Sequence, residues 1–265
     1  MTINHQPRKR FGQNFLVDQQ IIAQIVSAIN PKAEDNLIEI GPGMAAITEH
    51  LITHCPAMSV LEIDRDLVTF LQEKFAHNQQ FTVHSGDALK TDFAQFHQGR
   101  ELRLVGNLPY NVSTPLLFHL LDVGHLIKDM HFMLQREVVD RIGAAPGTKS
   151  YGRLSVMIQY YCRVSPLLAV PPQSFRPAPK VQSAVVRLKP HKTLPNVCHN
   201  ESLLSQIVSQ CFQQRRKTLR NGLRSYAQHL DAVAGVIDLS RRAEQLSVGD
   251  FVTLTNSIDE SLHPI

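Results

Sequence analysis

The sequence of 265 residues has no tryptophan and few other aromatic residues. Its four cysteines are far apart and form no C-x-x-C pair: Cys55, Cys162, Cys198 and Cys211. Neither a zinc ribbon nor a disulfide framework is therefore expected, and the histidines show no H-E-x-x-H spacing that would indicate a metal site. No apolar run is long enough to cross a membrane, and residues 1–10 lack the apolar core of a secretion signal. These absences favour a soluble protein of the reducing cytoplasm.

Acidic residues are scarce in one third of the chain. Residues 141–230 hold fourteen lysines and arginines but a single acid, Glu201, so this segment carries +13 while the whole chain carries only +4. A basic segment of this size on a near-neutral chain indicates contacts with phosphate groups, and hence a nucleic-acid partner. The alternative is a set of charges that only solvate the surface.

The residues after Glu201 have a spacing that predicts a helix-like stretch with two distinct faces, with a helix at 203–213, a second helical run at 223–228 and a last helix from Ser247. The apolar positions on one side are Leu204, Val208, Phe212, Leu219 and Leu223. Arg216, Arg220 and Arg224 recur at every fourth position beside them, as on a neighbouring face of the same helix. We expect the apolar face to pack against the protein and the three arginines to meet a polyanion.

A glycine-rich loop lies between a predicted strand at residues 37–40 and a predicted helix at residues 47–52. Gly41 and Gly43 let the backbone approach a ligand closely, and the start of the helix presents free N–H groups. With Ala46 the loop even fits the G-x-G-x-x-[GA] fingerprint of dinucleotide-binding proteins. A nicotinamide enzyme is therefore a competing interpretation of this segment.

The next three predicted strands also end in polar residues. Glu62 follows the strand at 59–61 about 20 residues after the glycines, where a carboxylate binds ribose hydroxyls. Asp87 follows the strand at 81–83, and Asn107 follows the strand at 102–105. The carboxyl ends of parallel strands meet at one crevice, so we expect these residues to line a single pocket with the glycine loop. Taken singly, Asp87 is typical of a turn cap and Glu62 of a solvated strand end.

Asn107-Leu108-Pro109-Tyr110 is the most informative segment of the chain. The exocyclic amine of adenine is a poor nucleophile because its lone pair is delocalised into the ring. The side-chain oxygen of Asn107 and the carbonyl of Leu108 could each accept one amine hydrogen, while Pro109 restricts Leu108 to an extended geometry. Tyr110 could stack on the base. The segment therefore predicts adenine-amine methylation, although these residues also occur in ordinary turns.

Several further segments carry a resemblance to a known family, and they cover nearly the whole chain in the expected order. They are 13–16 (QNFL), 135–138 (QREV), 175–181 (FRPAPKV), 215–219 (RRKTL) and 243–247 (AEQLS). With the motifs above, they make the chain similar to the ribosomal RNA adenine dimethyltransferases, and more closely to their bacterial small-subunit branch. One departure is visible, because the family has a third glycine in the loop where this chain has Ala45 or Ala46. We expect slight tightening of the backbone there and no loss of the cofactor.

The resemblance implies S-adenosylmethionine as cofactor and direct methyl transfer to two adjacent adenosines near the 3′ end of 16S rRNA, each methylated twice, in the small ribosomal subunit. It implies a cofactor site formed by Asn14, Leu16, Gly41, Gly43, Glu62, Asp87 and Asn107. The catalytic set would be Asn107, Leu108, Pro109, Tyr110 and Phe175, with Phe175 on the second face of the base. The alternative for Phe175 is an ordinary core aromatic.

The expected architecture is a doubly wound, seven-stranded α/β domain of the Rossmann-like methyltransferase class, followed by a small all-helical domain. We place the catalytic domain at 1–190, a Pro- and His-containing linker at 190–195 and the helical rRNA-binding domain at 195–265. The candidate RNA-binding residues are Arg8, Lys9, Arg10, Arg176, Lys180, Arg215, Arg216, Lys217, Arg220 and Arg224. We expect a monomer.

Three other functions remain open at this stage. A resistance-type methylase of large-subunit (23S) rRNA would share every cofactor motif. A DNA adenine methylase would more often carry Asp or Asn-Pro-Pro-Tyr and a sequence-reading domain. A non-catalytic subunit assembly factor would use the same basic surface without methyl transfer.

Overall fold

The computed structural model describes residues 13–263, and the chain divides into two compact units. The first comprises the residues up to Val139 together with Val164–Pro190, and the second comprises Asp140–Arg163 and the residues from His191 onward. The predicted basic arm Arg8, Lys9 and Arg10 lies outside the described residues. No helix in the described part of the chain is long and apolar enough to span a membrane.

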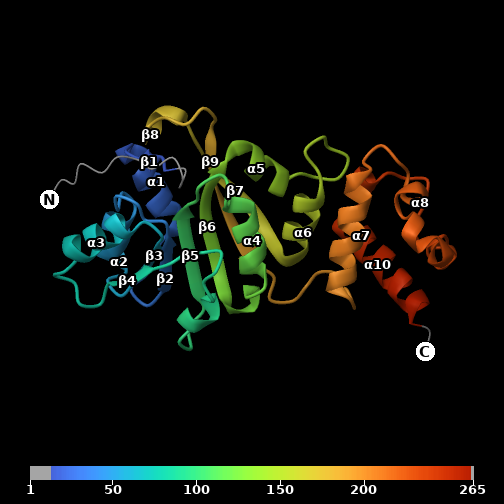
Figure 1. Cartoon of the computed structure of the whole chain (residues 1–265), viewed down its shortest axis with the longest axis horizontal. Helices are drawn as coiled ribbons and strands as arrows, with labels where there is room; N and C mark the ends of the chain where they lie inside the picture. Colours follow the sequence, from blue (N-terminus) through green and yellow to red (C-terminus); the bar gives the residue numbers. More distant parts are fainter. Residues whose placement is uncertain (1–12, 264–265) are drawn as a thin grey trace. The chain divides into compact units, whose positions relative to one another are not determined.

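The first unit is built on a seven-stranded sheet with the strand order β4-β3-β2-β5-β6-β9-β7 (Figure 1). The strands are β2 (Asn36–Ile40), β3 (Ser59–Glu62), β4 (Thr82–Ser85), β5 (Leu102–Asn107), β6 (Ile127–Gln135), β7 (Cys162–Val170) and β9 (Ser183–Pro190). The five strands from β4 to β6 are parallel, whereas β9 runs antiparallel to β6. The predicted doubly wound sheet is therefore confirmed, as a mixed sheet rather than a purely parallel one.

The helices of this unit follow the strands, as the alternating sequence pattern predicted. They are α1 (Gln19–Ile29), α2 (Thr48–His54), α3 (Arg65–Lys74) and α4 (Ser113–Leu121), while α5 (Arg136–Ile142) continues into the second unit. Asp18 and Asp64 cap the starts of α1 and α3 with side-chain oxygens that accept backbone N–H groups. A small antiparallel sheet, not predicted from the sequence, pairs β1 (Phe15–Leu16) with β8 (Phe175–Arg176). It brings the amino-terminal segment to the loop that contains Phe175.

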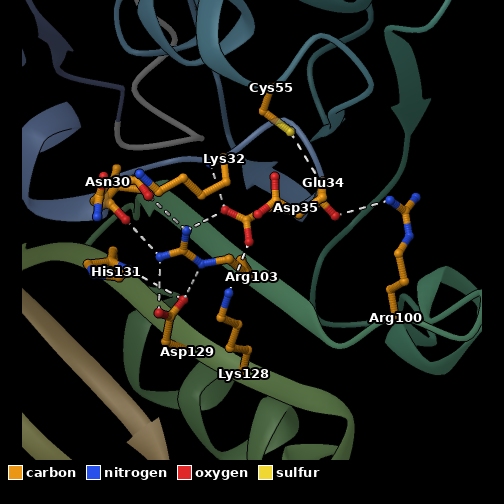
Figure 2. A network of polar contacts seen from close by, with 11 residues as sticks. Asn30, Lys32, Glu34, Asp35, Cys55, Arg100, Arg103, Lys128, Asp129 and His131 are labelled. Carbon is orange, nitrogen blue, oxygen red and sulfur yellow. Dashed lines mark hydrogen bonds and ion pairs between the residues drawn. The ribbon is translucent and has the colours of Figure 1, made fainter.

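Arg103 ties several elements together near the amino-terminal ends of the strands (Figure 2). Its side chain is 5% exposed and forms ion pairs with Asp35 at 2.6 Å and Asp129 at 2.9 Å. It also donates to the carbonyl oxygens of Ile29 and Asn30 at the end of α1. Burying a guanidinium is tolerated because nearly all of its donors find acceptors. This network fixes α1, β2, β5 and β6 at the end of the sheet away from the predicted site.

The second unit contains no described strand apart from the first two residues of β7, in agreement with the predicted helical domain. Its helices are α6 (Arg153–Tyr161), α7 (Glu201–Gln213), α8 (Leu219–Gly222), α9 (Leu230–Val233) and α10 (Val248–Leu262). Short 3₁₀ turns at Arg224–His229 and Ala243–Gln245 connect them. The last helix, expected from Ser247, is α10, which follows Ser247 as its N-cap.

The helix predicted at 203–213 is confirmed as α7, and the second helical run falls on the 3₁₀ segment Arg224–His229. The prediction that Arg216, Arg220 and Arg224 share one helical face is wrong. Helix α7 ends at Gln213, and the three arginines lie on a turn, on α8 and on the following 3₁₀ segment. The chain leaves the helix because Thr218 pairs with Arg242 and the Leu219 N–H donates to the Arg241 carbonyl at 2.8 Å. All three arginines are nevertheless exposed, and Leu219 and Leu223 are buried as expected.

The unit boundaries differ in one respect from the domains predicted at 1–190 and 195–265. The last crossing between units lies at Pro190 and His191, next to the predicted linker. Asp140–Arg163, which includes α6, groups with the carboxyl-terminal helices although we placed it in the first domain. Whether the two units act as separate catalytic and RNA-binding domains stays a prediction.

Candidate active site

The carboxyl ends of the parallel strands in the first unit enclose a cavity of about 330 Å³. It brings together every residue predicted for cofactor binding and catalysis: Asn14, Leu16, Gly41, Gly43, Glu62, Asp87, Asn107, Leu108, Pro109, Tyr110 and Phe175. The expectation that several strand ends share one pocket is borne out by this geometry. The binding and catalytic roles of the individual residues remain predictions.

The glycine loop turns sharply at the end of β2. Gly41 and Gly43 have φ angles of +67° and +57°, in the region that favours glycine. A Cβ atom on Gly43 would lie 3.0 Å from the ring of Phe15, so this glycine also admits the amino-terminal segment. Ala45 has a φ of +66° and occupies a left-handed conformation that costs a non-glycine residue roughly 1–2 kcal/mol. Ala45, one of the two positions where the third glycine would stand, therefore adopts a backbone conformation that glycine takes without this cost.

Glu62 is 4% exposed, so its interpretation as a solvated strand end is wrong. Its Oε1 accepts the backbone N–H groups of Ile63 and Asp64, both at 2.9 Å, and its Oε2 accepts the Gly43 N–H at 3.2 Å. Burial raises the pKa of Glu62, and the three N–H groups oppose that rise. The backbone therefore holds this carboxylate rigidly at the cavity wall, in the position expected of a ribose acceptor.

Asp87 combines a turn cap with a place in the cavity wall. Its Oδ1 accepts the Leu89 N–H at 3.0 Å, which is the capping role expected of a lone aspartate after a strand. The same residue lines the cavity beside Gly86 and Ala88. One carboxylate oxygen thus shapes the turn while the residue faces the ligand space, so the two interpretations are compatible.

Asn107 and Leu108 present two acceptors at the end of β5. The Asn107 Nδ2 donates to the Asn14 carbonyl at 3.0 Å, which leaves Oδ1 as the free acceptor of that amide. The Leu108 N–H donates to the Met133 carbonyl at 3.2 Å, while no described residue donates to the Leu108 carbonyl. The arrangement provides the pair of oxygens that the amine chemistry requires.

The two aromatic residues of the site are held differently. The Tyr110 hydroxyl forms a hydrogen bond of 2.9 Å with Ser183 of β9, so its ring is fixed at both ends. Phe175 lines the cavity but is only 1% exposed and belongs to the hydrophobic core with Leu16 and Val105. The structure thus fixes the ring of Tyr110 and places Phe175 in the core, while the contact of either ring with a base stays a prediction.

Sequence reasoning missed three features of the site. Glu39 lines the cavity, is 2% exposed and accepts the Thr48 hydroxyl at 2.6 Å; burial raises its pKa to about 7. Gly106 precedes Asn107, and a Cβ there would lie 2.5 Å from the Ile40 carbonyl, so only glycine fits between β5 and β2. Gln13 donates to Asp64 at 3.2 Å. The signal for Glu39 was a charged residue inside an otherwise apolar strand.

The members of the predicted RNA-binding set that the structure describes are exposed, but two of them also have partners within the protein. Arg176 donates to the carbonyl oxygens of Gln173 and Phe175. In the second unit, Arg215 donates to the carbonyls of Lys149 and Tyr151, at 3.0 and 2.9 Å, and therefore fastens the loop before α6. The remaining described members of the set, namely Lys180, Arg216, Lys217, Arg220 and Arg224, are exposed.

Comparisons with known proteins agree with this geometry. The model of the ribosomal RNA adenine dimethylase family matches residues 4–260. Ribosomal RNA small subunit methyltransferase A of Saccharophagus degradans is 57% identical over 255 residues, covering 96% of this chain and 95% of that protein. The protein of the same name from Acinetobacter baylyi is 53% identical over 255 residues, which are 96% of this chain and 93% of that protein.

Two solved structures resemble the chain over most of its length. A dimethyladenosine transferase from Plasmodium falciparum has a TM-score of 0.79 at 25% identity, covering 91% of this chain and 95% of that one. A 23S rRNA methyltransferase, ErmE, has a TM-score of 0.72 at 22% identity, covering 93% of this chain and all of that one. The second likeness concerns the fold alone.

Proposed function

Because the chain belongs to the ribosomal RNA adenine dimethylase family, we propose that it dimethylates two adjacent adenosines near the 3′ end of 16S rRNA in the small ribosomal subunit. The enzyme is an S-adenosylmethionine-dependent rRNA adenine dimethyltransferase. Support for the small subunit comes from relatives at 53–57% identity that carry that subunit in their names. A ribosomal substrate further supports action in the cytoplasm, and we propose that the protein acts as a monomer.

The cavity has the donors and acceptors that S-adenosylmethionine needs. The buried Glu62 carboxylate would accept ribose hydroxyls, and Asp87, which lines the same cavity, would bind the adenine edge of the cofactor. The positive-φ glycines bring backbone close to the ligand, and Asn14 and Leu16 close the cavity from the amino-terminal side. When bound, the cofactor supplies an electrophilic methyl group on a sulfonium.

Catalysis by this chain rests on positioning the adenine amine. The Asn107 Oδ1 and the Leu108 carbonyl would accept its two hydrogens and draw the nitrogen lone pair out of conjugation. Tyr110, fixed by Ser183, would stack on the base. No strong general base is required, because the amine proton becomes acidic once the nitrogen is methylated. The target adenine must be unstacked, which suits a loop or an extruded nucleotide.

The exposed cations of both units support an RNA partner. Arg216, Lys217, Arg220 and Arg224 of the second unit, with Lys180 and Arg176 of the first, would contact phosphates. Arg215 could contribute as well, although its guanidinium already fastens the loop before α6. We propose Arg8, Lys9 and Arg10 as a further contact with RNA, on the basis of their positive charge alone.

The proposal rests on one observation, namely that the Asn107 and Leu108 acceptors line the same cavity as the Glu62 carboxylate. It is tested by incubating the protein with methyl-labelled S-adenosylmethionine and, separately, unmethylated small subunits, large subunits and DNA. We expect label only in small subunits. Label in large subunits would favour the resistance-type methylase, and label in DNA the DNA adenine methylase. Binding to small subunits without label would favour a non-catalytic assembly factor.

A further inference from the structure

A loop and a helix of the first unit each form part of the cavity wall. The loop follows β4, and its residues 86–89 line the cavity. The helix is α4, which follows the segment 107–110 and lines the cavity with Leu116. His119 lies three residues after Leu116, a spacing that puts both side chains on the same face of α4. His119 is thereby directed to the side of the helix on which the ligand space lies.

A hydrogen bond joins His119 to this loop. The Nε2 atom of His119 lies 2.8 Å from the carbonyl oxygen of Thr91. A carbonyl oxygen can only accept, so Nε2 carries the hydrogen and donates it. The imidazole ring also lies edge-on to the ring of Phe93, with 6.0 Å between the ring centroids, and Phe93 is buried. The imidazole is therefore held by the end of the loop and by the buried ring that follows it.

Thr91 connects this contact to Asp87. The Thr91 hydroxyl and the Lys90 N–H both donate to the Asp87 carbonyl, each at 2.9 Å. The Asp87 carboxylate in turn accepts the Leu89 N–H at 3.0 Å. Donors along the loop thus converge on Asp87, and His119 adds a contact from a separate helix. The position of Asp87 at the cavity wall therefore depends on how the loop is fixed to α4.

We propose that His119 is a positioning residue for the adenine subsite of the cofactor, because it holds the loop that carries Asp87 against α4. This role depends on the proposed contact of Asp87 with the adenine edge. A carboxylate oxygen accepts the adenine amine well only when it is aimed at that amine, and a loop that must be ordered at each binding event costs affinity. His119 is not among the described residues that line the cavity, so it would act through Asp87.

The test compares two ligands that differ only at the adenine amine. The first is S-adenosylhomocysteine, and the second is its 6-deamino analogue, in which hydrogen replaces the amine. Their dissociation constants are measured by calorimetry for the wild type, His119→Leu, His119→Gln and Asp87→Asn. Glutamine restores an N–H donor close to the position of Nε2, and asparagine keeps an acceptor for the Leu89 N–H. His50→Leu, on an exposed position of α2, is the matched control.

The wild type should bind S-adenosylhomocysteine at least about tenfold more tightly than the analogue, as expected of a hydrogen bond to a charged acceptor. Asp87→Asn should lose this preference. His119→Leu should reduce it about 2- to 10-fold, which is the worth of one neutral hydrogen bond, while His119→Gln and His50→Leu should keep it. A variant that is merely less stable binds both ligands more weakly in the same proportion, so the ratio separates positioning from loss of folded protein.

A preference that Asp87→Asn loses but His119→Leu keeps would overturn the role of His119. A preference reduced equally in His119→Leu and His119→Gln would overturn the hydrogen bond to Thr91 as its cause. No preference in the wild type would overturn the adenine contact of Asp87 and, with it, this role of His119. Because only ligand binding is measured, each of these results is independent of which nucleic acid the protein methylates.

Discussion

The side-chain amide of Asn107 donates to the backbone carbonyl of Asn14 at 3.0 Å, and this contact decides which way the amide points. An asparagine has one acceptor oxygen and one donor nitrogen. With Nδ2 bound to the Asn14 carbonyl, Oδ1 is left to accept a hydrogen from the adenine amine in the proposed reaction. A single hydrogen bond therefore joins the proposed cofactor segment to the proposed acceptor of the reaction.

Replacing Asn107 by alanine should remove most turnover. The variant loses an acceptor that is used as the amine changes geometry, and a comparable hydrogen-bonding group is worth roughly 3–4 kcal/mol in the transition state, or about a 100- to 1,000-fold loss of rate. Cofactor affinity, measured by calorimetry, should fall much less. Methylation by Asn107→Ala at a near-normal rate would contradict the assignment.

Replacing Glu62 by glutamine should weaken S-adenosylmethionine. The amide keeps the size of the side chain but replaces a charged acceptor, so ribose hydrogen bonds become weaker and the dissociation constant should rise at least about tenfold. The matched control is Glu73→Gln, on an exposed position of α3. Equal affinities for the two variants in calorimetry would remove Glu62 from the cofactor site.

Replacing Arg216, Arg220 and Arg224 together by alanine should weaken binding to small subunits and leave cofactor affinity intact. Each lost phosphate contact should lower the slope of log affinity against log salt by about 0.7–0.9, so the wild type should be the more salt-sensitive protein. The measurement is subunit affinity across a salt series. Identical slopes and affinities would mean that these exposed arginines only solvate the surface.

Glu39 should make the folded protein less stable as pH rises. Burial raises its pKa from 4.5 to about 7, so the stabilising contribution is complete below pH 4.5 and is lost as pH rises toward 7. The shift corresponds to about 3 kcal/mol. Relative to the wild type, Glu39→Gln should gain about that free energy of unfolding between pH 4.5 and 7. A difference that does not vary with pH would contradict this assignment.

His131 should make the folded protein more stable as pH rises, which is the opposite of the effect of Glu39. It is 3% exposed, its ring nitrogens have no hydrogen-bond partner among the described residues, and Asp129 lies 3.7 Å away (Figure 2). Burial lowers its pKa from 6.5 to about 4, so its contribution is complete above pH 6.5 and is lost as pH falls toward 4.

The loss attributed to His131 is about 3 kcal/mol, and His131→Leu should not show it. Glu39 and His131 lie opposite Val105 on the two strands beside β5, and their effects offset each other in the wild type between pH 4.5 and 6.5. Urea titrations of each variant in that range should therefore reveal opposite slopes. If the unfolding free energies of His131→Leu and the wild type change in parallel with pH, the account is contradicted.

The cavity could be predicted from the sequence because each of its strand ends has a signal in neighbouring residues. Each strand ends where an apolar run gives way to a polar residue, and parallel strands bring their carboxyl ends to one edge, so Glu62, Asp87 and Asn107 could be placed together. Glu39 and Gly106 were missed because their roles come from neighbouring strands. A glutamate within β2 gains its raised pKa only when neighbouring elements bury it, and Gly106 is required only because the Ile40 carbonyl lies beside it.

The helix predicted from Glu201 shows where periodicity fails. Arg216, Arg220 and Arg224 keep a helical spacing, but the chain turns after Gln213 because Thr218 pairs with Arg242 far along the sequence. Arg242 is too far along the chain for the spacing of residues around Thr218 to reveal this pairing. The interactions of Arg215 with Lys149 and Tyr151 were hidden for the same reason.

The most direct test of the central claim is to identify the nucleotides that the protein modifies. Small subunits lacking the modification would be incubated with S-adenosylmethionine, and the rRNA would be digested and sequenced by mass spectrometry. We predict dimethylation at the exocyclic amines of two adjacent adenosines near the 3′ end of 16S rRNA, and none in reactions with Asn107→Ala over the same time. Methyl groups at other nucleotides, or an unmodified rRNA, would contradict the account.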